Sequence, residues 1–156
     1  MAKRRSLRSR RWRRWTVLGI AVAALGAGAF MVLRPSAQGR ADPGNAAQVA
    51  RGKAVYALEC AACHGVHLEG QPNWKRPLAN GFMPAPPHDV TGHTWHHSDE
   101  DLFGITKHGL VPYAPPGYQS LMPAYGGKLS DEDIWAVLAY IQASWPAPIL
   151  AQRRHR

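Results

Sequence analysis

The amino-acid sequence predicts an all-α protein with one small folded domain, preceded by one transmembrane helix. Two segments begin with a serine that is followed by three acidic residues and then by apolar residues, at Ser98 and at Ser130. This order is typical of a helix N-terminus, because the serine caps free backbone amides and the acids favour the positive end of the helix dipole. No segment alternates apolar and polar residues as a half-buried strand does. These observations favour helices throughout the folded part.

The first helix of the domain is expected to begin after Asn45 and to run into Cys60. Asn45 can cap this helix, and it follows a linker at 34–44 whose composition is typical of turns. The residues that share one face of the helix are Val49, Gly52 and Tyr56. The folded domain is then expected over residues 45–146.

The last helix is expected from Asp131 to about Trp145. It stops before Pro146, because proline has no backbone N–H with which to continue a helix. The apolar residues on one side of it are Ile134, Val137, Leu138 and Ile141. The residues that follow, 147–156, are expected to form a basic C-terminal tail.

Residues 60–64, Cys-Ala-Ala-Cys-His, carry the clearest chemical signal. Cys-x-x-Cys-His is the attachment motif for a c-type haem. On one helical turn, Cys60 and Cys63 can each form a thioether with a haem vinyl group, and His64 then lies under the iron as its proximal ligand. The chain has no other cysteine. A covalently held haem would also supply apolar volume to a domain of about 100 residues, which is small for a core.

Three other interpretations of this motif compete with haem attachment. A thioredoxin-like redox pair needs a βαβ setting, which is not visible, and does not need the histidine. A zinc site would borrow His93 and His97, but 29 residues separate Cys63 from His93, against about 12–15 in finger-type sites. A chance match is the third. The sequence favours haem over all three.

Met122 is the best candidate for the ligand on the opposite side of the iron. It lies in Leu-Met-Pro-Ala-Tyr-Gly-Gly, directly before the last helix. A thioether is a soft ligand, and histidine/methionine ligation raises the reduction potential of haem. Proline and glycine suit a loop that presses a side chain onto a metal. Met31 lies in an apolar N-terminal run, and Met83 lies in a proline-rich loop with no helix close behind it.

Together these motifs resemble a class I mono-haem cytochrome c. The resemblance covers about residues 45–146. It is strong at Cys60-x-x-Cys63-His64-Gly65 and at Met122-Pro123-x-Tyr125 with the helix that follows, and weaker in the Pro/His/Trp-rich middle. It implies a small all-α fold wrapped around one covalently bound haem c. It also implies thioethers at Cys60 and Cys63, and His64 and Met122 as axial ligands.

The resemblance implies two further contacts. The first and last helices should cross closely, with Gly52 admitting the approach and Tyr56 packing near Val137 and Tyr140, unless the glycine is incidental. A backbone carbonyl in Ala85-Pro86-Pro87 should accept a hydrogen bond from the proximal histidine, with Pro72 as a competing candidate. Trp74 and Trp95 are expected either to pack against the haem or donate an indole N–H to a haem propionate, or to lie in the plain core.

The N-terminal 33 residues differ sharply from the rest. The first 14 contain eight Lys or Arg and no acid, whereas the chain from Ala41 onward contains nine basic and ten acidic residues. Residues 16–33 carry no charge and are just long enough to span a membrane, and the basic tail at 1–15 keeps its end in the cytoplasm. We therefore expect a single-pass protein of the cytoplasmic (inner) membrane, with its haem domain on the periplasmic or extracellular side.

Two alternatives concern this segment. It could be a signal peptide, left uncleaved or cleaved near Ala37, but cleavage there puts Pro35 at an unfavourable position. Ser9-Arg10-Arg11 resembles a twin-arginine export signal. That route carries folded proteins, whereas the family implies haem attachment after translocation, so the arginines are interpreted as an orientation signal. A basic run is also typical of nucleic-acid binding, but the apolar segment accounts for it, and we expect no nucleic-acid partner.

Histidines are dense in the middle segment. The members of this group are His88, His93, His96, His97 and His108. Neutral imidazoles suit copper or zinc, so a second metal site is one interpretation, and a haem with two histidine ligands is another. The simpler interpretation places these histidines in loops near the haem edge, since no carboxylate or thiol lies at ligand spacing.

The resemblance implies an electron carrier, because an iron with both axial positions filled has no vacant site for substrate. Its partners would be redox proteins that donate and accept electrons. Two alternatives stay open. The domain could be a cytochrome subunit of a membrane dehydrogenase or oxidase complex, or a haem enzyme or gas sensor in which Met122 is absent from the iron or easily displaced.

Overall fold

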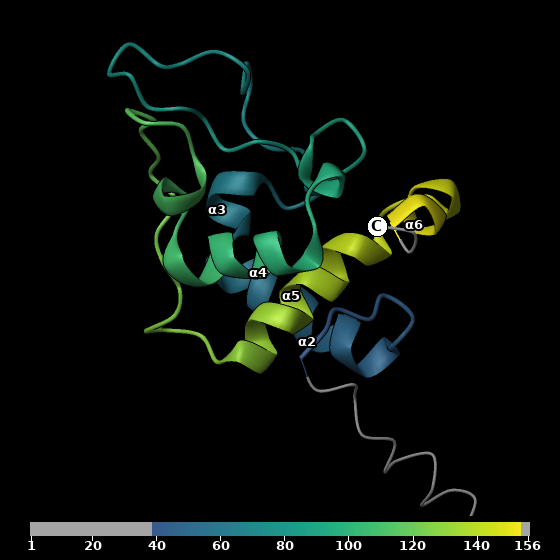
Figure 1. Ribbon diagram of the computed structural model, residues 1–156. Helices are drawn as coiled ribbons and strands as arrows, with labels where there is room; N and C mark the ends of the chain where they lie inside the picture. The colour runs from purple at the N-terminus through teal and green to yellow at the C-terminus, as the bar shows by residue number, and fades with distance from the viewer. Residues whose placement is uncertain (1–38, 154–156) are drawn as a thin grey trace, which may run out of the picture. The chain divides into compact units, whose positions relative to one another are not determined.

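Residues 39–153 are described by the computed structural model, and they belong to a compact unit of the chain that begins at Ala37. Its helices are α2 (Ala46–Glu59), α3 (Ala61–His64), the 3₁₀ turn η1 (Thr94–His96), α4 (Asp99–His108), the 3₁₀ turn η2 (Val111–Tyr113), α5 (Asp131–Ala143) and α6 (Ala147–Arg153) (Figure 1). In this part of the chain, β pairing is limited to one isolated bridge between Met83 and Ser120. The prediction of an all-α domain is confirmed.

The predicted transmembrane helix at 16–33 lies outside the described residues. Among the helices within 39–153, none combines the length and the apolar composition that a membrane crossing requires.

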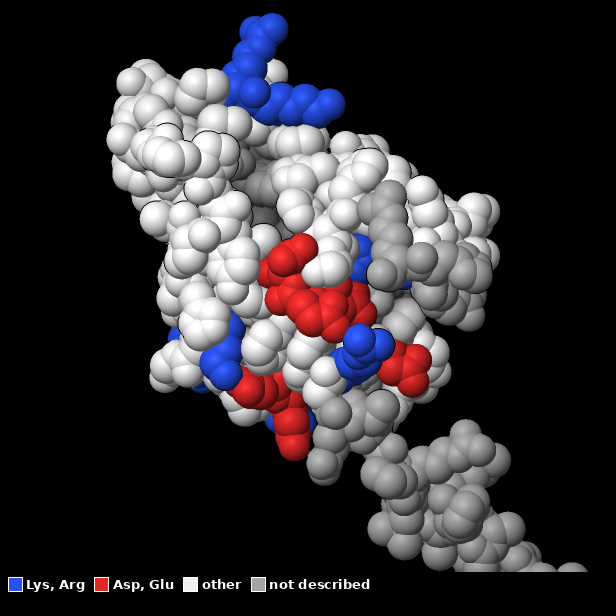
Figure 2. Space-filling view, viewed as in Figure 1, with Lys and Arg blue, Asp and Glu red and all other residues white. Residues whose placement is uncertain are grey.

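The predicted helix starts are confirmed by their caps. Asn45 accepts hydrogen bonds from the backbone amides at the start of α2. Ser98 and Ser130 each accept from the amide three residues later, at the starts of α4 and α5. Of the six acids behind these two serines, four are exposed and Asp99 and Asp133 are partly buried, and Figure 2 shows acidic side chains gathered over these two helix starts. Local sequence thus determines where three of the helices begin.

The helices α2 and α5 form the centre of the domain and make the most extensive helix–helix contact described (Figure 1). Their approach is closest at Gly52, where an added methyl group would lie 1.9 Å from the backbone oxygen of Ala136. Tyr56 is buried one turn later, and its ring lies 5.3 Å from that of Tyr140. The close crossing implied by the resemblance is therefore present, and Gly52 is not incidental.

A long connection without α-helix runs from α3 to α4. It leaves the helical body as an extended loop, drawn in teal at the top of Figure 1, and returns through η1. Residues in this connection pair with one another, since Gln71 donates from its backbone to Ala85 at 2.9 Å and accepts from Ala85 through its side chain at 2.9 Å. These bonds join the two ends of the extended loop.

The C-terminal segment is helical where the sequence predicts a basic tail. α6 follows the end of α5 after three residues and runs from Ala147 to Arg153. Pro148 lies in its first turn, where a missing backbone N–H costs nothing. Ile149 and Leu150 of this helix pack against the core, so the basic composition of 147–156 did not reveal a short helix that is partly held by apolar contacts.

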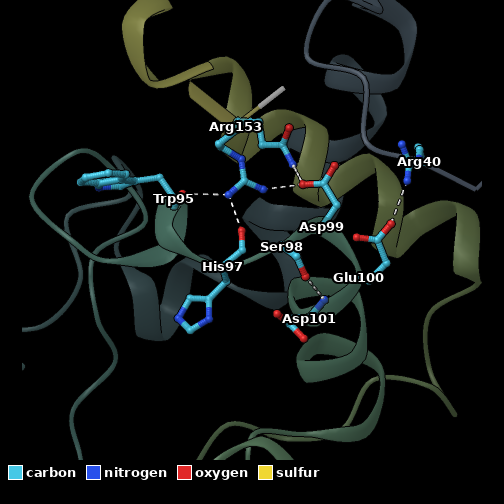
Figure 3. A network of polar contacts seen from close by, with 9 residues as sticks. Arg40, Trp95, His97, Ser98, Asp99, Glu100, Asp101 and Arg153 are labelled. Atoms are coloured by element: carbon cyan, nitrogen blue, oxygen red, sulfur yellow. Dashed lines mark hydrogen bonds and ion pairs between the residues drawn. The ribbon is translucent and has the colours of Figure 1, made fainter. Parts of the chain in front are cut away.

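Arg153 fastens α6 to the segment that precedes α4 (Figure 3). Its guanidinium donates to the backbone oxygen of Trp95 at 2.9 Å and to that of His97, and it pairs with Asp99 at 2.5 Å. It also lies over the ring of Trp145, 4.9 Å from the centroid. The Arg153 side chain is 11% exposed, so it joins three separate parts of the chain in a largely buried position.

Candidate functional site

Cys60 lies between α2 and α3, and Cys63 lies in α3, one helical turn further along the chain. The backbone amides of Cys63 and His64 both donate to the oxygen of Cys60, at 3.1 and 2.9 Å. Both thiols are free, and Cys63 is exposed whereas Cys60 is partly buried. Burial, followed by the nearby Glu59 and Cys63, raises the pKa of the Cys60 thiol to about 11. The two sulfurs therefore project from adjacent positions of one turn, as the attachment motif requires.

His64 is buried and oriented by a backbone carbonyl. Its side chain is 8% exposed, and its Nδ1 lies 2.9 Å from the oxygen of Pro86. Because a carbonyl can only accept, Nδ1 carries the proton and Nε2 keeps a free lone pair. Burial lowers the pKa of His64, and the hydrogen bond to Pro86 opposes this. The prediction that the Ala85–Pro87 loop supplies this acceptor is confirmed, and Pro72 is not the acceptor.

Two tyrosine hydroxyls form hydrogen bonds to the backbone next to the motif. Tyr56 donates from Oη to the oxygen of Gly65, and Tyr125 donates from Oη to the oxygen of Glu59, each at 2.7 Å. Burial raises the pKa of both phenols, that of Tyr125 to about 12. Both hydroxyls therefore stay protonated at neutral pH and hold the residues on either side of Cys60 and Cys63.

The motif opens onto a cavity of about 540 Å³. Cys60, Cys63 and His64 lie in its wall, together with both Met83 and Met122. Its apolar lining also includes residues of α4 and α5: Leu102, Ile105, Val137, Leu138 and Ile141. A mostly apolar cavity of this size, with a few polar groups at fixed points, is typical of a cofactor site.

Met122 lies on a segment that is held at several points. Tyr125 donates from its backbone to Thr106 at 3.0 Å, and Gly126 donates to Lys107 at 2.9 Å, so the segment is bonded to the end of α4. The amide of Met122 donates to the Ser120 hydroxyl at 3.1 Å. Met83 reaches the same cavity from the extended loop, and its amide donates to Gln119 at 3.3 Å. The structure therefore brings both methionines to the cavity.

The two tryptophans of the middle segment do not line this cavity. Trp74 stacks on His93, with ring centroids 5.3 Å apart, and borders a smaller hollow beside it. Trp95 stacks on His96 at 3.7 Å, and its buried Nε1 has no hydrogen-bond partner within residues 39–153. Of the two expected locations, Trp95 takes the core, since it packs against the core cluster, whereas Trp74 is not among the residues that do so.

The histidine group does not assemble a metal site in the described part of the chain, where no cluster of three or more His, Cys, Asp or Glu side chains could hold an ion. His93 and His97 do lie together, with ring centroids 5.5 Å apart. His88 lies elsewhere, with its ring stacked on His64. Because it lies beside His64 on the same wall, His88 is not placed to bind an iron from the opposite side.

Three contacts of the connection between α3 and α4 were not predicted. They are the stack of His88 on His64, the hydrogen bond from Trp145 Nε1 to the His88 oxygen at 2.7 Å, and the attachment of Arg153 to the backbone of the same connection. The sequence offered one usable signal, since His88 is only two residues after Pro86, whose oxygen binds His64.

The residues that line the cavity fit a covalently attached haem. Two neighbouring free thiols border an apolar cavity, and the buried His64 has its Nδ1 bonded, which leaves Nε2 for a metal. The chemistry of the donor set agrees, because imidazole and thioether are both established haem-iron ligands.

Comparison with known proteins agrees with this geometry. The family model described as cytochrome c matches residues 49–145. A cbb3-type cytochrome c oxidase subunit CcoP of Azospirillum brasilense is 35% identical over 62% of this chain and 28% of its own length. A thiosulfate dehydrogenase of Stutzerimonas stutzeri is 33% identical over 65% of this chain and 29% of its own length. The chain thus spans less than a third of each of these two relatives.

A smaller relative is matched over most of its length. The cytochrome c6 of Thermostichus vulcanus is 27% identical over 78% of this chain and 87% of its own length. No solved structure matches the chain significantly. Since the family model covers more than half of the residues, including the motif at 60–64 and Met122, the chain belongs to the cytochrome c family, as a class I member that binds haem c covalently and transfers electrons.

Proposed function

We propose that this protein is a mono-haem electron carrier in which Cys60 and Cys63 hold the haem and His64 and Met122 ligate its iron. The single observation that carries the proposal is that these four residues, from opposite ends of the domain, line one apolar cavity. When bound, the haem supplies an iron that gains or loses one electron. With both axial positions taken by protein side chains, no position remains for a substrate.

The protein's own residues keep this site fixed during electron transfer. Pro86 holds the proton of His64 on Nδ1, so the same nitrogen, Nε2, always faces the metal. Tyr125 and the backbone bonds around it hold the segment that carries Met122. A site that does not rearrange exchanges electrons at low cost, because little reorganisation accompanies the change in charge.

Spectroscopy of the purified protein tests this function. Reduced protein in alkaline pyridine should give a c-type haemochrome, and denaturing gels should keep haem on the polypeptide. A redox titration should follow a single one-electron step. The Cys60→Ser, Cys63→Ser double variant should lose covalent haem, and its retention there would contradict the proposed attachment. Rapid carbon monoxide binding by the reduced protein would instead favour a haem enzyme or gas sensor.

We also propose that residues 16–33 anchor the protein in the cytoplasmic membrane, with the haem domain on its outer side. Support comes from the absence of charge across this segment and from the eight Lys or Arg that precede it. Washed membranes should retain the cytochrome through high salt and release it with detergent. A soluble haem protein that begins near Ala37 or Asp42 would show that the segment is a cleaved signal peptide.

A second candidate function is that of a subunit in a larger oxidoreductase complex. The names of two relatives favour it, one being an oxidase subunit and the other a thiosulfate dehydrogenase. Membranes solubilised in mild detergent and separated on native gels distinguish the two. Haem stain at the mass of this chain alone supports the carrier. Haem stain that migrates with oxidase or dehydrogenase activity supports the subunit.

A further inference from the structure

His88 is stacked face to face on His64 in the wall of the cavity. The two ring centroids are 4.0 Å apart and the ring planes differ by 22°. Contact at this distance covers one face of the His64 imidazole. His88 belongs neither to the attachment motif nor to the proposed axial ligands, although it lines the same cavity.

The His88 ring is itself held in place. Its Nδ1 lies 2.8 Å from the Thr94 hydroxyl, and that hydroxyl is 3.4 Å from the oxygen of Pro87. A threonine hydroxyl has one proton, which it donates to the carbonyl, so it accepts from His88 Nδ1–H. These two bonds hold one edge of the ring in a fixed position.

The backbone of His88 is held as well. Its amide donates to Leu68 at 2.8 Å, and its carbonyl accepts from Trp145 Nε1 at 2.7 Å. The edge of Tyr56 approaches the ring, with centroids 6.4 Å apart and planes at 73°. Four other residues thus fix the side chain and backbone of His88. Tyr56 belongs to α2, Leu68 to the connection after α3, Thr94 to η1, and Trp145 follows the end of α5.

A hydrogen bond alone defines the plane of an imidazole poorly. The Pro86 carbonyl fixes which nitrogen of His64 is protonated, but carbonyl oxygens accept over a broad range of directions. Rotation of the ring about the line through Nδ1 and Nε2 leaves that bond largely intact. A rigid ring stacked on one face prevents this rotation, because any turn brings the two rings into collision.

We propose that His88 is a positioning residue for haem ligation, which sets the plane of the His64 imidazole by stacking on it. This rests on the proposed function, in which His64 binds the iron. The plane of an axial imidazole determines how the unpaired electron of low-spin ferric haem is distributed over the porphyrin. The haem methyl resonances of the oxidised protein therefore report the ring plane directly.

Proton NMR of the oxidised, haem-loaded, full-length protein at one pH tests the proposal. In His88→Ala the freed ring should change the order or the spread of the haem methyl resonances and shift the reduction potential. In His88→Phe, which keeps a ring but loses the bond to Thr94, both should stay near those of the unchanged protein. The matched control is His93→Ala, since His93 lines the same cavity but stacks on Trp74.

Each outcome decides the question. Unchanged methyl resonances in His88→Ala, a His88→Phe spectrum as altered as that of His88→Ala, or an equal effect of His93→Ala would overturn the positioning role. Should His88→Ala fail to fold, His88→Phe decides by itself: haem methyl resonances near those of the unchanged protein support the positioning role, and altered ones overturn it. An unmodified protein that lacks the low-spin signals of histidine-ligated haem would overturn the proposed function and this inference together, whereas low-spin signals with no response to His88→Ala overturn the inference alone.

Discussion

A methyl group added to Gly52 on α2 would lie 1.9 Å from the carbonyl oxygen and 2.4 Å from the carbonyl carbon of Ala136 on α5. Both atoms belong to the backbone, so no side-chain rotation can relieve the contact. The two central helices therefore approach to a distance that only glycine permits. The same crossing positions Tyr56, whose hydroxyl holds the backbone directly after the haem attachment motif.

The first prediction is that Gly52→Ala destabilises the folded protein. Overpacking costs about 1–3 kcal/mol, and here it should exceed the roughly 1 kcal/mol that alanine gains in helix propensity. Denaturant unfolding of the haem-loaded protein measures the change. Gly127→Ala is the matched control, because an added methyl group there has no neighbour within 4 Å. Equal midpoints for both variants would show that the helices can separate without cost.

The second prediction concerns Arg153, which holds α6 to the segment before α4. Arg153→Ala removes donors from two backbone carbonyls and from Asp99. Hydrogen bonds that involve a charged group contribute about 1.5–3 kcal/mol, so we expect a loss of free energy of unfolding in that range. Arg40→Ala is the control. It breaks an ion pair to Glu100 in which both side chains are mostly exposed, and such pairs contribute about 0.2–1 kcal/mol.

The sequence predicted the features that depend on short stretches of chain. Each cap depends on a side chain and on amides no more than three residues away, as at Asn45 and Ser130. The attachment motif likewise lies within one turn. The hydrogen bond between His64 and Pro86 spans a longer distance along the chain, and it was expected because the resemblance implied it, together with the crossing at Gly52.

Features that depend on the path of the middle connection were not predicted. The stack of His88 on His64 requires that the chain leave α3, form the extended loop and return with a ring on one particular face. No periodic pattern encodes such a path in a segment rich in proline and glycine. The position of Met83 in the cavity is a second example, since the bridge that places it pairs residues far apart in the sequence.

The third prediction concerns the pH dependence of stability through Asp133. The Ser130 side chain first, and then Arg51, lower the pKa of this carboxyl group below its ordinary value of 3.8. A carboxyl group with a lower pKa in the folded state stabilises the protein above the unfolded-state value, and this contribution is lost as the pH falls through the folded-state value. Protein with Asp133 should therefore lose stability in this acidic range.

Asp133→Asn tests this assignment, because the amide cannot ionise but keeps an acceptor oxygen for the Ser130 hydroxyl. The unchanged protein should be more stable than Asp133→Asn at neutral pH, and the difference should shrink as the pH falls below about 3.8. Thermal unfolding at a series of pH values measures it. A difference that stays constant across the acidic range would mean that the ionised carboxylate does not contribute.

The fourth prediction is that Met122, and not Met83, is the distal ligand of the haem iron. Oxidised protein should show a weak sulfur-to-iron charge-transfer band in the far red, and Met122→Ala should abolish it while the covalent attachment survives. The reduction potential should fall, because a thioether favours ferrous iron more than the water or histidine that would replace it. The reduced variant should also bind carbon monoxide, since an axial position becomes vacant.

Met83→Ala is the decisive control, because both methionines line the cavity. Met122 lies on a segment bonded to the end of α4 and braced by Tyr125, whose hydroxyl is bonded to the residue before Cys60. Met83 lies on the extended loop, where one backbone bond to Gln119 joins it to the segment that precedes Met122. A ligand must keep its distance to the iron through each change of charge, and the more firmly held segment meets this requirement. If Met83→Ala abolished the far-red band, or His96→Ala altered the ligation, Met122 would not be the ligand.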